Sequence, residues 1–295
     1  MTGVQTCALP ICGTGNWKVC YPSAGTYDIF SINTLDYNFS RPHNDYLRIL
    51  SETGYIGLTL IITSLISLLL RTLSTKRNRY GKLARLTIAF IIGIMGFTVF
   101  DFPIDRMEIF IWITLICATA ATLSLPKHIN KQIKRYETLY FVSVIIITLS
   151  LFIGITRWRS ESHYVDIVTS IRNRQWKEVE MHCNKARTSW YNLTPLGMPI
   201  AYYEGMALEY QNKPAIETFH SALKASPWCK QVLTDLGRLE YKIKQNTDTA
   251  ILFLQKAIKI SPAYSYAYFN LAQLYIYEHE WQKAIEVLDM LDLDK

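Results

Sequence analysis

The sequence predicts an all-α protein in which polytopic membrane helices are followed by an α-solenoid of stacked helical repeats. Half of the 295 residues are hydrophobic, and the apolar residues gather in four uncharged runs before residue 157. After that point charged residues and a helical periodicity dominate. We therefore expect lipid to surround the first part of the chain and water to surround the second.

Both ends of the chain are interpreted as incomplete. Residues 1–11, MTGVQTCALPI, resemble the translation of a sequencing-library adapter, and they contain no Lys or Arg as a secretory signal would. We leave them out of the fold as an artefact, so native sequence begins near Gly13. At the other end, VLDMLDLDK stops inside an expected helix, which indicates a fragment.

The four uncharged runs predict four transmembrane helices. They are 18, 15, 18 and 19 residues long and cover residues 53–70, 86–100, 109–126 and 138–156. About 18 apolar residues suffice to cross a bilayer. The second run is short, but Lys82 and Arg85 can extend toward the interface at one end, so we count it as a span.

The loops between these runs predict the topology. Residues 71–85 carry six Lys or Arg and residues 127–135 carry four, which is typical of cytoplasmic loops. In residues 101–108 the charged side chains are acidic apart from Arg106, and this loop is expected outside. The segments 12–52 and 157–295 then also lie outside, in the periplasm of an envelope-bearing bacterium. The net charge of +7 is thus a topology signal, and no nucleic-acid partner is expected.

The cysteines predict neither a metal centre nor a disulfide framework. Outside the excluded start they show no CxxC pair and no metal-ligand spacing: Cys12, Cys20, Cys117, Cys183 and Cys229. We expect no cofactor and no metal.

A four-part motif lies in the outside segment before the first run. It consists of His43-Asn44, nine residues, Gly54, two residues and Gly57. Glycines allow the backbone to approach closely where the chain enters a bilayer. A structural role is the alternative for each residue, as a surface hydrogen-bonding group for the histidine and as helix-packing positions for the glycines.

Two arginines flank the histidine. Arg41 and Arg48 are close enough in sequence to share one anionic pocket with His43. Imidazole can orient or deprotonate a hydroxyl, and guanidinium groups can neutralise a departing diphosphate. The alternative for both arginines, and for Arg106, is an anchor at the membrane interface.

The motif resembles the HN-x9-G-x2-G signature of the O-antigen ligase family, which transfers glycan from undecaprenyl diphosphate at the periplasmic face. GTGNWKV at residues 13–19 and the F-P-x-x-R pattern ending at Arg106 resemble further family segments, so the resemblance covers roughly residues 13–125. It implies a GT-C-like, multi-pass inner-membrane glycosyltransferase without cofactor. The implied roles are catalysis by His43, substrate or diphosphate binding by Arg41, Asn44, Arg48 and Arg106, and a structural motif of Gly54 and Gly57.

The resemblance leaves the acceptor open. Lipid A core, a growing polysaccharide and a protein hydroxyl are all used by relatives, so ligase, polymerase and protein O-oligosaccharyltransferase remain alternatives. Relatives carry further helices and arginines upstream, and this chain alone is therefore expected to be inactive. The alternative from a different class is a non-enzymatic, membrane-tethered repeat scaffold in which His43 is structural.

After residue 157 the sequence repeats every 34–35 residues, in a pattern that resembles tetratricopeptide repeats. Small alanines allow paired helices to approach, and larger residues fill the space between repeats. The successive copies contain Trp176, Val179, Cys183 and Ala186; Ala215, Phe219, Ala222 and Pro227; Ala250, Leu254, Ala257 and Pro262; and Tyr268, Leu271, Ala272, Tyr275, Ala284 and Leu288. A generic helical bundle is the alternative. A protein partner on the concave face is expected.

Overall fold

The computed structural model describes residues 16–24, 44–74, 81–100, 107–124, 136–189 and 191–291. Within these ranges the regular structure is helical, apart from two isolated β-bridges, Thr188 with Tyr191 and Leu193 with Pro199. The described part of the chain is therefore all-α, as predicted. The chain divides into two compact units, one of residues 1–17 and 41–146 and one of residues 18–40 and 147–295.

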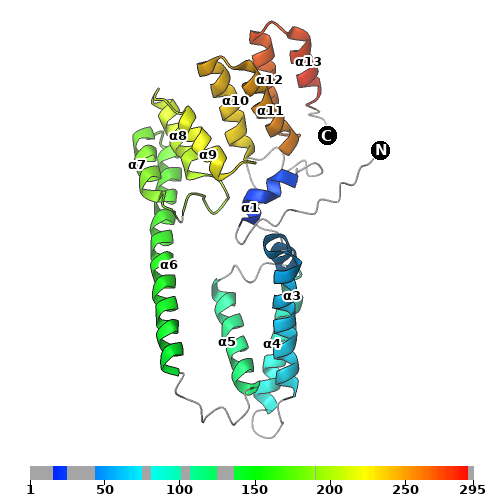
Figure 1. The fold of residues 1–295 in the computed structure, drawn as a ribbon. Coiled ribbons are helices and arrows are strands. Elements are labelled where there is room, and N and C mark those ends of the chain that lie inside the picture. Colours follow the sequence, from blue (N-terminus) through cyan, green and yellow to red (C-terminus); the bar gives the residue numbers. More distant parts are fainter. Residues whose placement is uncertain are drawn as a thin grey trace, which may run out of the picture. The chain divides into compact units, whose positions relative to one another are not determined.

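The first unit contains three helices that pack on one another (Figure 1). They are α3 (Asp45–Leu73), α4 (Gly81–Phe97) and α5 (Met107–Ser124). A fourth helix, α6 (Tyr136–Arg172), begins in this unit and continues without a break into the second.

Large apolar side chains are exposed along all four of these helices. Examples are Tyr55 and Ile56 on α3, Phe90 on α4, Trp112 on α5 and Phe152 on α6. Continuous exposed apolar surface is uncommon on soluble monomers and marks contact with another apolar phase. Among the described residues, one helix, Asp45–Leu73, is long and apolar enough to cross a membrane. The structure thus provides one such helix where the sequence predicts four spans.

The second unit is a row of helix pairs (Figure 1). After α6 come α7 (Trp176–Ala186), α8 (Ile200–Tyr210), α9 (Ile216–Ala225), α10 (Lys230–Lys244), α11 (Thr247–Ile260), α12 (Ser265–Tyr277) and α13 (Trp281–Asp289). From α7 onward each helix packs against its neighbours in sequence, and α10 also contacts α12. This is the packing of stacked helical hairpins.

The alanines of the repeat pattern lie between the paired helices. The six in the three regular copies each expose 3% of their surface or less: Ala215, Ala222, Ala250, Ala257, Ala272 and Ala284. The larger residues Phe219 and Leu254 are fully buried beside them. The degenerate first copy follows the same rule, since Val179, Cys183 and Ala186 are fully buried on α7.

The turn inside each helix pair contains a residue with left-handed backbone conformation. Arg174, Asn212, Gln245 and His279 have φ between 52° and 61°. The last three are spaced by 33 and 34 residues, close to the 34–35-residue period of the sequence repeat. The first interval is longer, and it includes the connection between α7 and α8, whose described residues form the two bridges. Lys18, on the short helix α1 (Trp17–Cys20), donates to the carbonyl of Thr194 in this connection at 3.0 Å.

A charged cluster connects α8 to α10. The two terminal nitrogens of Arg238 donate to the two carboxylate oxygens of Glu209 at 2.6 and 2.7 Å, and Nη2 also donates to Asp235 at 3.1 Å. These hydrogen bonds lower the pKa of the Glu209 carboxyl, whereas burial raises the pKa of Asp235. The two carboxyls therefore have opposite effects on how stability changes with pH.

Replacing Gly237 with Ala is expected to lower the free energy of unfolding by about 1–3 kcal/mol, the usual cost of overpacking a core. The new Cβ would lie 2.7 Å from Cγ of Leu254 and 3.1 Å from the carbonyl oxygen of Ala250. Gly154→Ala is the matched control, because nothing lies within 4 Å of a Cβ there. Thermal unfolding of the purified chain by circular dichroism measures both. Equal unfolding midpoints for Gly237→Ala and wild type would contradict this, since α10 and α11 could then move apart without a loss of stability.

Glu209→Gln is expected to destabilise the protein by about 1.5–3 kcal/mol at neutral pH, the usual worth of hydrogen bonds to a charged group. A carboxyl with a depressed folded pKa stabilises the fold above its unfolded pKa, and the contribution is lost as the pH falls through the folded pKa. The difference in unfolding free energy between Glu209→Gln and wild type should therefore shrink as the pH falls below 4.5, the ordinary pKa of a glutamate side chain. Urea unfolding at several pH values tests this, with the exposed Glu217→Gln as control. A difference in unfolding free energy that stays constant with pH would contradict the lowered pKa of Glu209.

Candidate functional site at the start of α3

The described part of the four-part motif lies in the first turns of α3. Three of the predicted site residues, Arg41, His43 and Arg106, lie outside the described residues. Asn44 is the N-cap of α3, and its Oδ1 accepts a hydrogen bond from the backbone N–H of Leu47 at 2.9 Å. This bond satisfies one of the donors that a helix start leaves without an intrahelical partner. Asn44 therefore fixes where the helix begins, directly after His43.

Arg48 is paired with a carboxylate that the motif alone does not single out. Its Nη2 lies 3.1 Å from Oδ1 of Asp45, whose side chain is only 1% exposed. Asp45 occupies the first turn of α3, where the helix dipole favours a negative charge. The three-residue spacing of an acid and a base on one helix face was the available signal for this pair. The pair orients the guanidinium of Arg48 and offsets part of its charge.

The start of α3 is held against the carboxyl end of α4. The backbone N–H of Asp45 donates to the carbonyl of Thr98 at 3.0 Å, and the hydroxyl of Tyr46 donates to the carbonyl of Met95 at 2.9 Å. Carbonyls at the end of a helix lack intrahelical backbone partners. The bond from Asp45 supplies such a donor to Thr98, and Tyr46 is a second donor to Met95 beside the Thr98 hydroxyl. The described motif residues are thus attached to a packed helix.

Both glycines of the motif stand where a larger residue is disfavoured, Gly54 by its backbone conformation and Gly57 by a neighbouring side chain. Gly54 has φ 71° and ψ −173°, inside a kink of α3, and this conformation is essentially restricted to glycine. At Gly57 an added Cβ would overlap Oγ1 and Cβ of the Thr53 side chain. The kink separates the polar start of α3 from its apolar remainder, which runs from Gly54 to Leu73.

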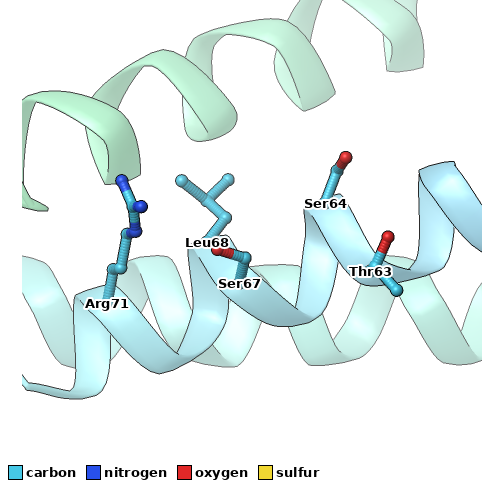
Figure 2. Close-up of a pocket in the computed structure, with 5 residues that line it drawn as sticks. All are labelled: Thr63, Ser64, Ser67, Leu68 and Arg71. Atoms are coloured by element: carbon cyan, nitrogen blue, oxygen red, sulfur yellow. The ribbon is translucent and has the colours of Figure 1, made fainter.

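A pocket of about 510 Å³ lies toward the other end of α3 (Figure 2). The described residues that line it are Thr63, Ser64, Ser67, Leu68 and Arg71. Figure 2 shows Ser64, Leu68 and Arg71 pointing to the same side of the helix. The hydroxyls of Thr63 and Ser64 already donate to backbone carbonyls one turn earlier, at 2.7 Å each. None of the described residues that line the pocket belongs to the motif.

The buried cysteines of the second unit are structural. Burial raises the pKa of the Cys183 thiol to about 12 and that of Cys229 to about 11. Only a thiolate is a good nucleophile, so neither side chain is reactive at neutral pH.

One group of potential ligands is not expected from the sequence. His163 and Asp166 on α6 and His182 on α7 bring three donor atoms together. The sequence signal was the spacing of His163 and Asp166, which places them on one face of a helix. The contribution of His182 depends on how α7 packs, which no local pattern specifies.

Comparison with known protein families assigns the C-terminal region of the chain. Residues 243–295 match the tetratricopeptide repeat family, and they contain α11, α12 and α13, with the buried alanines described above. This region is a tetratricopeptide repeat. The repeat interpretation is thereby confirmed for these residues. A search of curated proteins found no match to the chain.

Gly54→Ala is expected to destabilise the chain by about 1–3 kcal/mol, because alanine strains in this backbone conformation. Gly96→Ala in α4 is the matched control, since nothing lies within 4 Å of a Cβ there. Thermal unfolding of the two purified variants compares their stability, and hydrogen exchange at residues 53–57 reports the kink itself. If Gly54→Ala keeps the midpoint and exchange pattern of the control, the kink does not require glycine.

Proposed function

We propose that the chain is part of a multi-pass inner-membrane glycosyltransferase. It would transfer an oligo- or polysaccharide from an undecaprenyl-diphosphate carrier to an acceptor at the periplasmic face. The observation that carries the proposal is the HN-x9-G-x2-G motif directly before the apolar part of α3. Its two glycines occupy positions that only glycine fits well, so the G-x2-G spacing has a physical reason beyond resemblance.

The membrane part of the proposal is supported by helix lengths and exposed apolar surface. From the Gly54 kink to Leu73, α3 rises about 30 Å, the thickness of a bilayer's hydrocarbon core. The 37 residues of α6 give a length of about 55 Å, enough to cross and still contribute to the second unit. The basic loops 71–85 and 127–135 favour a cytoplasmic location on one side. In this topology the motif and the repeats are both periplasmic.

The proposed transfer step assigns roles to His43 and to the three arginines of the predicted site. His43 accepts the proton of the acceptor hydroxyl, whose oxygen forms a bond to the anomeric carbon of the donor sugar. The bond from that carbon to the diphosphate oxygen breaks, and the lipid diphosphate leaves with the electron pair. Arg41, Arg48 and Arg106 neutralise the charge that grows on it. Since Asp45 lies 3.1 Å from Arg48, Arg48 contributes directed hydrogen bonds more than net positive charge.

None of these residues determines which acceptor receives the glycan. Lipid A core, a growing polysaccharide and a protein hydroxyl each supply the nucleophilic oxygen, so ligase, polymerase and protein O-oligosaccharyltransferase share this step. One observation favours a second candidate function. The tetratricopeptide repeat at residues 243–295 fits a membrane-tethered scaffold that recruits an envelope protein, with His43 as a structural residue.

Replacing His43 with Ala at the native locus distinguishes the two candidates. An enzyme that needs His43 as base is expected to lose about 100-fold or more in transfer rate, the usual contribution of general base catalysis. The readout is surface glycan on gels and glycan on envelope proteins, with equal protein amounts confirmed by immunoblot. His279→Asn, in an exposed turn of the repeats, is the matched control.

Unchanged glycan in the His43→Ala strain, at a normal amount of protein, would rule out the enzyme and leave the scaffold. Loss of surface polysaccharide would favour a ligase or polymerase. Loss confined to glycoproteins would favour the protein O-oligosaccharyltransferase.

A further inference from the structure

Three donor side chains converge between the first two helices of the repeat unit. His163 and Asp166 lie one turn apart on α6, and His182 reaches them from α7. The Nδ1 atoms of the two histidines are 3.2 Å apart. Oδ2 of Asp166 lies 3.5 Å from Nδ1 of His163 and 3.3 Å from Nδ1 of His182. The three atoms therefore form a nearly equilateral triangle.

This triangle has the dimensions of one face of a tetrahedral metal site. Ligands bound to zinc at roughly 2.0–2.1 Å in tetrahedral geometry are separated from one another by about 3.3–3.4 Å. The three observed separations lie within about 0.2 Å of that range, the tolerance expected of a metal site. A single ion above the face would reach all three atoms at normal bond lengths.

The three atoms of this triangle can share either a proton or a metal ion. A neutral imidazole carries a proton on one ring nitrogen only, and a carboxylate oxygen carries none. A proton on Nδ1 of one histidine can satisfy the cluster by donating to a neighbouring atom, and a metal ion that faces the three lone pairs can take its place. We propose that His163, Asp166 and His182 bind a transition-metal ion of the zinc type.

The donor set selects the class of metal. Calcium and magnesium prefer sites made wholly of oxygen ligands, whereas imidazole nitrogen suits zinc and its first-row neighbours. Three protein ligands leave a fourth position for water or an incoming ligand. Access is available, because the side chain of Asp166 is about half exposed, at 48%.

The surrounding packing holds the ligands in place. Ile167, next to Asp166, and Cys183, next to His182, are fully buried in one hydrophobic cluster with Val179 and Ala186. The backbones of both helices are thereby fixed on either side of the triangle. A bound ion would bridge α6 and α7 and stabilise this first helix pair by mass action.

Zinc titration of the untagged, chelator-treated full chain by isothermal calorimetry tests the site. One ion is expected to bind to the wild type, and His182→Ala should weaken its binding by at least about tenfold, since even outer-shell changes cost that much. His220→Ala is the matched control. It removes a histidine that contacts one carboxylate, Glu240, at 2.9 Å but lies outside the cluster.

Two further measurements keep the result clear if a variant folds poorly. Circular dichroism checks each variant, and Asp166→Asn removes only the charge of one ligand. Cobalt added to the wild type should give the intense visible absorption of tetrahedral coordination. Absent cobalt bands, or zinc binding equal in wild type and His182→Ala, would overturn the proposal and leave only hydrogen bonds among the three side chains. Because none of these readouts involves glycan, failure here is independent of the proposed transferase.

Discussion

Close approach between paired helices is the constraint on which the repeat unit depends. At Gly237 there is no space for even a methyl group, because the Leu254 side chain and the Ala250 carbonyl occupy it. The buried alanines maintain the same closeness along the array. Helices this close must be joined by tight turns. A residue with left-handed backbone conformation, such as Gln245, stands in each of the four described turns that join the two helices of a pair. Packing and turn geometry thus impose the same period on the sequence.

Features set by local spacing were predictable from the sequence, and those set by long-range contacts were not. The alanine and proline spacing indicated the repeats because it reflects packing within one helix pair, and the family match at residues 243–295 confirms it there. The connection at residues 187–199 gave no such signal. It is held in part by Lys18, which is distant in sequence and bonds to Thr194. A pattern of nearby residues contains no information about such a contact.

The same distinction applies to the candidate site. Positions 54 and 57 were recognisable as a glycine pair, but the backbone angle that makes Gly54 necessary became visible only in the folded chain. Asp45 was adjacent to the motif and still not singled out, since its importance comes from burial beneath the end of α4. A buried carboxylate is costly unless it is paired. The partner, Arg48, is held beside it at 3.1 Å.

Helix α6 connects the two proposals physically. Its exposed large apolar side chains include Trp158, and Val165 beyond it; tryptophan is a residue type that favours the membrane interface. His163 follows about 7–8 Å beyond Trp158 along the helix. If α6 spans the bilayer, the three-ligand cluster lies just outside the membrane, at the point where α6 becomes the first helix of the repeat unit. A metal ion there would fix the contact of α6 with α7 at the membrane surface. The repeat array would then begin at a defined height above the bilayer. A helix pair held only by apolar contacts would fix that height less firmly.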